Sequence, residues 1–352
     1  MYTRIERPET LEPKELDRYL ERGWYRIGQT LMTCRFLLWG GVLRSAIWTR
    51  TPLEDYRLRK GLRKMMNRNG RRFRLTEGVL SRATVDRQRE ALYQRYLTVA
   101  RGDRAADLQD FLYGESPHDL FNTREIAIWD DDRMVGFSWF DIGGDSVQSL
   151  LGVYDPEYAS HSLGFYSMML EVKYGLENGL RYHYSGYVLP GEPVMDYKLR
   201  VGHMYWLDTQ RNQWRPWEEF NREAMPTQQL RRALWSARAA LLRRGVPSAM
   251  RGYPMFEAGA YDPELGTCLD QPLVLECFPR RGAGTALMIT WNLERSFYEL
   301  IRCARAVGRF RSNDGESYDT RVELWVVMER LSNRATAEGI AAEAARVGSP
   351  AR

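Results

Sequence analysis

Apolar positions recur with two different periods along this chain, and the change of period separates its parts. Over residues 13–22, Leu16, Tyr19 and Leu20 fall on one face at helical spacing, and Pro13 stands at the start. Similar spacing predicts further helices over residues 52–67, 82–100, 107–113, 230–244 and 336–347. Residues 24–51 alternate loosely and contain several glycines, which predicts short strands and turns.

Strand spacing dominates from residue 123 onward. Residues 125–129 and 134–141 alternate on either side of three aspartates, which is the pattern of a hairpin. A third strand is expected over residues 147–154, a helix over 162–176 ending at Asn178-Gly179, and a fourth strand over 180–188. This order predicts an α+β fold with a mixed sheet, in which one right-handed crossover joins the parallel strands.

The remaining segments suggest how the chain is divided. Residues 206–217 are polar and irregular, as expected of a boundary, and strand-like runs follow at 273–278, 286–291 and 321–327. A length of 352 residues suggests about two domains. We divide the chain into a small N-terminal domain with a basic segment (1–80), a helical connector (81–120), a central α+β domain (121–220) and an α+β C-terminal extension of unknown role (221–352).

Charge is distributed unevenly. The formal net charge is only +5, but nine of the eighteen residues from 57 to 74 are Arg or Lys and none is acidic. Such a run repels itself unless an anion compensates it, which favours a polyanionic partner such as nucleic acid. The alternative is a solvated basic face on a surface helix.

Cysteine content and hydropathy exclude several classes of protein. The four cysteines form no CxxC pair, so neither a zinc site nor a disulfide framework is expected. The N-terminus has no apolar signal-peptide core, and no stretch reaches the ~18 apolar residues of a membrane span. We therefore expect a cytoplasmic protein with reduced thiols and no membrane contact.

The strand–helix–strand block from residue 147 to 188 is the part of the sequence that points to chemistry. Its first strand ends at Tyr154, and its helix opens at Ser162-Leu163-Gly164, where backbone N–H groups would form an anion site. CoA-dependent N-acyltransferases use the same layout with a glycine-rich turn, but here only Gly164 is present. The block is also rich in tyrosine, which suits a pocket that needs hydroxyl groups or faces for base stacking.

This block resembles the C-terminal domain of arginyl-tRNA–protein transferases and of their bacterial relatives, the aspartate/glutamate leucyltransferases. The resemblance is carried by an ordered set with matching spacing: Tyr154-Asp155-Pro156-Glu157-Tyr158, Ser162-Leu163-Gly164-Phe165-Tyr166-Ser167, Glu171, Gly179-Leu180, Tyr182, Tyr184, Gly186-Tyr187, Pro190-Gly191, Met195 and Tyr197-Lys198. More loosely, residues 20–28 and 50–69 resemble the family's N-terminal region. The resemblance implies a GNAT-like mixed sheet with flanking helices.

The family's N-terminal cysteine cluster, associated with metal or iron–sulfur binding, is not conserved in this sequence. The expected positions fall at or near Gly40, Leu43 and Ala46, and only Cys34 lies nearby. One thiolate cannot hold such a cluster. We therefore expect a divergent member with no metal, no iron–sulfur cluster and no other cofactor, and with aminoacyl-tRNA as co-substrate.

The resemblance implies transfer of arginine or leucine from charged tRNA to the N-terminal amine of a protein or peptide, as in protein arginylation and the N-degron pathway. The catalytic candidates are Asp141, Glu171 and Tyr184. The expected contacts of the aminoacyl group and the tRNA 3′ end are Tyr154, Ser162, Leu163, Gly164, Tyr166, Tyr187 and Lys198. The expected contacts of tRNA phosphates are Lys60, Arg63, Lys64 and Arg68.

Three other hypotheses remain. An N-acyltransferase on the same fold would use acyl-CoA. A non-catalytic homologue would bind tRNA and have lost the chemistry. A transferase could also act on a peptide precursor, with specificity set by residues 221–352. His161 and His183 are possible bases, although a lone histidine is more often structural.

Overall fold

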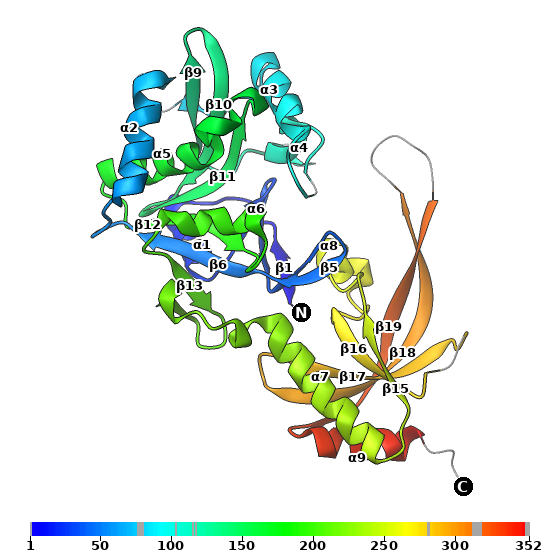
Figure 1. The fold of residues 1–352 in the computed structure, drawn as a ribbon. Coiled ribbons are helices and arrows are strands. Elements are labelled where there is room, and N and C mark those ends of the chain that lie inside the picture. The colour runs from blue at the N-terminus through cyan, green and yellow to red at the C-terminus, as the bar shows by residue number, and fades with distance from the viewer. Residues whose placement is uncertain are drawn as a thin grey trace. The chain divides into compact units, whose positions relative to one another are not determined.

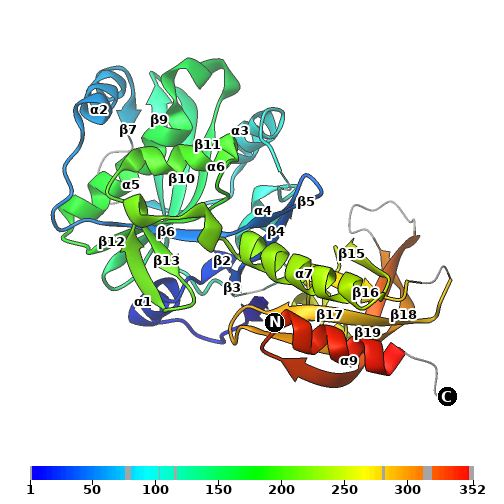
Figure 2. The same ribbon diagram turned by 60° about the horizontal axis from the view of Figure 1, so that its bottom comes forward.

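The computed structural model describes residues 2–75, 81–102, 104–114, 116, 118–279, 282–311 and 319–348. Within it the chain forms two compact units (Figures 1 and 2). The larger unit comprises Ile5–Thr33 and Ala46–Phe220, and the smaller unit comprises Met1–Arg4, Cys34–Ser45 and Asn221–Arg352. Each unit has its own sheet and its own buried core, so each is described separately.

The larger unit is built on a nine-stranded sheet in the order β14-β13-β6-β12-β11-β10-β9-β7, with β8 also paired to β9. Only β11 and β12 pair in parallel among the described strands of this sheet. The strands are β6 (Ile47–Pro52), β7 (Arg74–Leu75), β8 (Ser81–Arg82), β9 (Thr123–Asp130), β10 (Arg133–Ile142), β11 (Ser146–Tyr154), β12 (Tyr182–Val188), β13 (Tyr205–Asp208) and β14 (Gln213–Pro216). Earlier in the chain come β1 (Thr3–Glu6) and the hairpin of β2 (Tyr25–Ile27) and β3 (Thr30–Cys34).

Helices cover both faces of this sheet. They are α1 (Pro13–Glu21), α2 (Lys60–Arg72), α3 (Arg87–Leu97), α4 (Leu108–Tyr113), α5 (Leu163–Glu177) and α6 (Pro193–Asp196), with short 3-10 segments η1 (Pro156–His161), η2 (Tyr197–Val201) and η3 (Trp217–Glu219). On one face α5 and α2 share a core through Met169 and Leu62, and on the other α3 packs against the sheet through Leu92 and Trp139 (Figure 1). The parallel pair β11–β12 is joined through α5, whose residues are mostly buried.

The smaller unit holds a five-stranded antiparallel sheet in the order β15-β16-β17-β18-β19. Its strands are β15 (Ser248–Gly252), β16 (Leu273–Cys277), β17 (Thr285–Asn292), β18 (Phe297–Arg311) and β19 (Asp319–Arg334). Two helices, α7 (Pro226–Arg243) and α9 (Ala337–Gly348), contribute Leu234 and Ile340 to a core with Leu275 and Ile289 of the sheet. The unit also contains β4 (Phe36–Trp39), β5 (Val42–Ser45), α8 (Ala258–Tyr261), η4 (Arg222–Ala224) and η5 (Pro263–Leu265).

Most predicted elements are confirmed. The predicted helices at 13–22, 82–100, 107–113, 162–176, 230–244 and 336–347 correspond to α1, α3, α4, α5, α7 and α9. The hairpin and the two strands around α5 are β9, β10, β11 and β12, and the coarse α+β class is confirmed. Within the described ranges, no helix is long and apolar enough to cross a lipid bilayer.

Two local predictions are wrong. The helix expected over residues 52–67 is α2, which begins at Lys60 and runs through Asn69 and Gly70 to Arg72. The Asn-Gly turn signal fails because the buried Asn69 side chain donates from Nδ2 to the backbone oxygen of His161 at 2.9 Å, which holds that position inside the helix. Residues 206–217, expected to be irregular, instead form most of the hairpin of β13 and β14, which extends the large sheet from β6, and the division between the two units follows at residues 220–221.

Candidate functional site

The parallel ladder between β11 and β12 is short. Residues 146–148 pair with residues 182–184, and the two strands share no further pairs. Beyond that point β11 continues along β10 to Tyr154, whereas β12 continues along β6 to Val188. The strands therefore separate next to the end of β11, where the chain turns into α5.

Tyr25 of β2 lies where the two strands separate. Its Oη donates to the backbone oxygen of Ser149 on β11 at 2.6 Å, and a Cβ added at Gly186 on β12 would lie 3.0 Å from its ring. Burial strongly raises the pKa of Tyr25, so the phenol stays protonated as a donor. The separation of the strands is thus held by one buried tyrosine.

Aromatic side chains gather around the end of β11. The rings of Tyr154 and Tyr96 meet edge to face with centroids 5.4 Å apart. A Cβ added at Gly164 would lie 3.3 Å from the Tyr154 ring, so the glycine lets the first turn of α5 approach this tyrosine. Of the predicted 3′-end contacts, the structure therefore brings Tyr154 and Gly164 together.

A second pair of predicted contacts joins β12 to the 3-10 segment η2 that follows it. Lys198 of η2 donates from Nζ to the backbone oxygen of Tyr187 at 3.1 Å. Lys198 is partly exposed, but its ammonium lies among many protein atoms, and this desolvation lowers its pKa to about 8, with Arg104 adding to the effect. An ammonium group with this pKa is mostly charged at neutral pH and can bind an incoming phosphate, and it loses its charge only slightly above neutral pH.

The N-terminus of α5 has an unusual backbone. Ser162 adopts a left-handed conformation with φ at 54°, which is uncommon for a residue other than glycine. The turn before it is fixed because Asn69 of α2 binds the backbone oxygen of His161. The first backbone amides of a helix have no acceptor within the helix, so this end can bind an anion or a polarised acyl oxygen.

Glu171 lies in the middle of α5 and is only 1% exposed. Its Oε2 is 2.9 Å from Nε2 of His183 on β12, and its Oε1 accepts a hydrogen bond from Ser138 on β10. Both carboxylate oxygens are therefore engaged by side chains of the sheet. These contacts connect α5 to β10 and β12 and leave Glu171 little access to a substrate.

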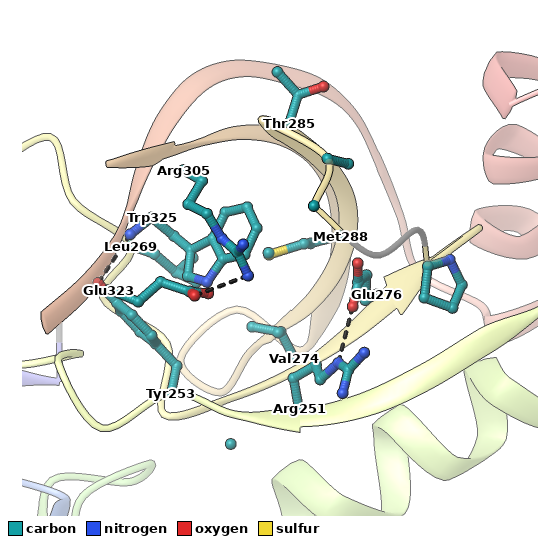
Figure 3. A pocket seen from close by; sticks show the side chains of 14 residues that line it. Arg251, Tyr253, Leu269, Val274, Glu276, Thr285, Met288, Arg305, Glu323 and Trp325 are labelled. Carbon is teal, nitrogen blue, oxygen red and sulfur yellow. Dashed lines mark hydrogen bonds and ion pairs between the residues drawn. The ribbon is translucent and has the colours of Figure 1, made fainter. Parts of the chain in front are cut away.

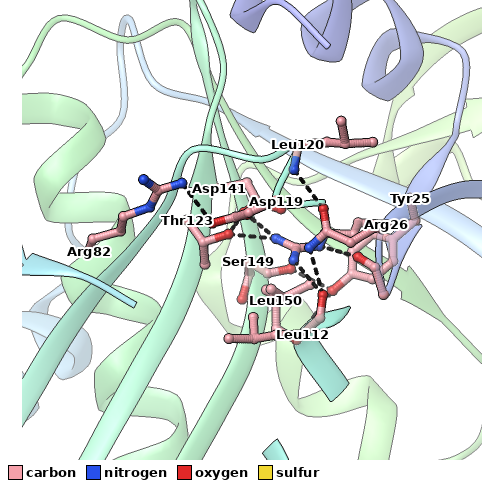
Figure 4. A network of polar contacts seen from close by, with 12 residues as sticks. Tyr25, Arg26, Arg82, Leu112, Asp119, Leu120, Thr123, Asp141, Ser149 and Leu150 are labelled. Carbon is pink, nitrogen blue, oxygen red and sulfur yellow. Dashed lines mark hydrogen bonds and ion pairs between the residues drawn. The ribbon is translucent and has the colours of Figure 1, made fainter. Parts of the chain in front are cut away.

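Asp141 lies in a buried polar network on the opposite face of the sheet (Figure 4). Its Oδ1 accepts from Nη1 of Arg26 at 2.9 Å and from Oγ1 of Thr123 at 2.6 Å. Nη2 of the same arginine donates to the backbone oxygen of Leu112 at 2.8 Å. Burial raises the pKa of Asp141, partly offset by Arg26.

The three predicted catalytic residues do not converge. Alternate residues of a strand point to opposite faces, so Asp141 and Tyr184 lie on the face away from α5. Tyr184 packs with Leu16 and Leu20 of α1, and Arg50 donates to its hydroxyl at 3.3 Å. Leu163 and Tyr166, predicted 3′-end contacts, are likewise buried in the core under α5.

The predicted phosphate contacts lie on one exposed helix. Lys60, Arg63, Lys64 and Arg68 are all exposed on α2. The opposite face of this helix packs through Leu62 against α5, and its end is bound to the turn before α5. The basic surface is thus attached directly to the element that carries the candidate 3′-end site.

Comparison with known proteins identifies a family whose sequences match this part of the chain. The sequence model of "Arginine-tRNA-protein transferase, C terminus" matches residues 88–208, from α3 to the end of β13. These residues are therefore similar to the C-terminal part of the arginine-tRNA–protein transferases. No part of the smaller unit falls within the match.

Curated relatives agree with the family model. An aspartate/glutamate leucyltransferase of Leptospira interrogans is 26% identical over 215 residues, covering 58% of this chain and 76% of the relative. Proteins of the same name are 28% identical in Helicobacter hepaticus (51% of this chain, 74% of the relative) and 27% in Acinetobacter baumannii (52% and 65%). A solved structure of L-PGS from Bacillus licheniformis aligns with 13% identity over 42% of this chain and 48% of that chain, at a TM-score of 0.31.

Sequence reasoning missed several residues of the site. Tyr96 and Arg104 come from segments far from the family block, and nothing in their local pattern sets them apart. Tyr25 lies within residues 20–28, which resemble the family's N-terminal region, but it was not named as a contact. Tyr197 was part of the resemblance but was not named as a contact. In the structure burial raises its pKa, and its ring packs against Phe165. The sequence signal that could have pointed to the missed tyrosines is the high tyrosine content of the chain.

Proposed function

We propose that the protein is an aminoacyltransferase that moves one amino acid from a charged tRNA to the N-terminal amine of a protein or peptide. The observation that carries this proposal is the family match over residues 88–208, which contains the separating strands, α5 and Lys198. The names of the relatives support leucine as donor and acidic N-termini as acceptors, and the family model supports arginine.

The proposed reaction is aminolysis of the ester between the amino acid and the tRNA ribose. The neutral amine of the acceptor attacks the ester carbonyl, an N–C bond forms, the C–O bond to the ribose breaks, and a proton passes from the amine to the ribose oxygen. The ester is already activated and an α-amine has a pKa near ~7.7–8.0, so alignment of the two substrates is the enzyme's main contribution. No cofactor takes part in this scheme.

We assign roles from the geometry. The first amides of α5, after Ser162, would stabilise the oxyanion, and Tyr154 would offer a face on which a terminal base can stack. Lys198 would contact a phosphate of the tRNA 3′ end, and the exposed α2 would contact the acceptor stem. Glu171 acts as a positioning residue, because both of its oxygens are engaged.

A GNAT-like arrangement is the finer fold that we propose for the larger unit. It is supported by the mixed sheet, by the one parallel pair joined through α5, and by the separation of β11 from β12. An acyl-CoA donor is less well supported. Only Gly164 stands at the helix start, and the Ser149 carbonyl where the strands separate already accepts a hydrogen bond from Tyr25.

The proposal is tested with a pool of radiolabelled aminoacyl-tRNAs and peptides with different N-termini. We expect transfer of a single kind of amino acid, abolished by RNase. Label transferred from an acyl-CoA pool, with none from any tRNA, would show that the acyl-CoA alternative is correct. Charged tRNA is used in translation, so we propose the cytoplasm as the site of action.

A further inference from the structure

The sheet of the smaller unit has two unlike faces. Leu275 and Ile289 point to the face covered by α7 and α9. Their neighbours along the same strands, Val274 and Met288, point the other way, because alternate residues of a strand face opposite sides. On that second face the strands and the segment that follows β15 enclose a cavity of about 440 Å³ (Figure 3).

The lining of the cavity is apolar on the inside. Val274, Met288, Leu269 and Tyr253 are each at most 5% exposed, and Trp325 of β19 adds an aromatic wall. Tyr253 accepts a hydrogen bond on Oη from the backbone N–H of Trp325 at 3.2 Å, which fixes the tyrosine ring against β19. The volume falls within the range of small-molecule sites.

Two ion pairs border this apolar space. Arg251 of β15 binds Glu276 through Nε at 2.9 Å, and Arg305 of β18 binds Glu323 through Nη2 at 2.8 Å. Figure 3 shows these four side chains coming from different strands around the same space. Two guanidinium groups face two carboxylates, so the wall has no excess of positive charge, and a polyphosphate such as RNA would meet both carboxylates.

Paired donors and acceptors suit a peptide main chain. A peptide carries N–H and C=O groups in equal number, and the guanidinium and carboxylate groups at the wall can bind both. β15 pairs only with β16 in the described sheet, so its outer edge is open beside Arg251. An extended peptide can add to such an edge through backbone hydrogen bonds while one of its side chains enters a neighbouring pocket.

We propose that this cavity is a docking site for the acceptor polypeptide, which inserts one large apolar side chain between Met288 and Trp325 while its main chain binds the edge of β15 and the two Arg–Glu pairs. The occupant is the acceptor, so this inference rests on the proposed transfer function. The family match does not include this unit. The site would therefore provide a recognition step particular to this chain.

Binding is measured first, without tRNA, so that the result does not depend on catalysis. The probe is N-acetyl-phenylalanine methylamide, which has an apolar side chain and two peptide groups but no amine to accept an amino acid. Ligand-observed NMR on the full chain should show saturable binding. Trp325→Ala, which removes the half-buried aromatic wall of the cavity, should weaken binding about tenfold or more. Met328→Ala, exposed on the same strand but not lining the cavity, should leave binding unchanged.

The polar wall is tested with a matched pair of variants. Arg251→Gln should weaken binding of the probe, because this arginine borders the cavity. Arg302→Gln removes a similarly exposed arginine with its own glutamate partner elsewhere on the sheet, and should have no effect. Equal binding by wild type and Trp325→Ala would overturn the proposal. So would binding of a short oligouridylate that Trp325→Ala abolishes, since the cavity would then be an RNA site.

Transfer assays then connect the site to the reaction. With a twelve-residue acceptor peptide containing phenylalanine, Trp325→Ala should raise KM about tenfold, whereas transfer to a dipeptide acceptor should be unchanged. Equal KM values for the long peptide in both proteins would contradict a docking role. If no tRNA supports transfer by the wild type, the proposed function fails, and the NMR result still decides whether the cavity binds peptides.

Discussion

The clearest functional consequence of the geometry concerns the charge of Lys198. Desolvation lowers the pKa of its ammonium to about 8, so it is mostly charged below that pH and mostly neutral above it. If only the charged form binds a tRNA phosphate, KM for charged tRNA should rise with the neutral fraction. The rise is about twofold at pH 8 and about elevenfold at pH 9, relative to acidic solution.

The assay is initial-rate transfer at saturating acceptor, with charged tRNA varied at each pH and corrected for spontaneous ester hydrolysis. Lys198→Arg is the matched control, because a guanidinium keeps its charge throughout this range. We expect a flat KM in the arginine variant and a rising KM in the wild type. An equal rise in both proteins would place the titrating group elsewhere, and no rise in the wild type would refute the phosphate contact.

Three further predictions test the basic surface, the strand separation and the buried network. Arg63→Glu on α2 should weaken tRNA binding and flatten its salt dependence in filter-binding assays, whereas Lys173→Glu on α5, also exposed, should change neither; equal losses would argue against a localised phosphate site. Both Gly186 (φ 81°) and Gly191 (φ 98°) have left-handed backbones, but of the two only Gly186 is close to a ring. Gly186→Ala should therefore lower the free energy of unfolding in urea by ~1 kcal/mol or more beyond Gly191→Ala. Equal losses in the two variants would show that the ring contact has no effect. Asp141→Asn should lower the free energy of unfolding by ~3 kcal/mol by leaving its arginine partner buried and uncompensated; a loss below ~1 kcal/mol would show that the pair is not needed.

The fold of the central block could be predicted from sequence because its signals are local. The aspartates between β9 and β10 specify a turn, and the spacing of apolar residues in α5 specifies a helix. The failures lie where distant contacts override local preference. Asn69-Gly70 reads as a turn, yet the buried contact of Asn69 with the backbone of His161 keeps both residues in α2.

The candidate site was harder to predict than the fold. The resemblance supplied Tyr154, Gly164, Tyr187 and Lys198, which the structure brings into two neighbouring pairs. It could not show that Asp141 would be buried and paired with an arginine 115 residues earlier in the chain. Contacts across such separations leave no mark on periodicity or composition, so a strand-end aspartate and a buried ion-pair partner look alike in sequence.

The most direct test of the account is the mass of an acceptor peptide after incubation with the protein and charged tRNA. A peptide with a free acidic N-terminus should gain the mass of one leucine or one arginine residue at its N-terminus, and the same peptide with an acetylated N-terminus should gain nothing. A peptide that remains unmodified with every charged tRNA, but becomes acylated when an acyl-CoA mixture is supplied, would contradict the proposed function.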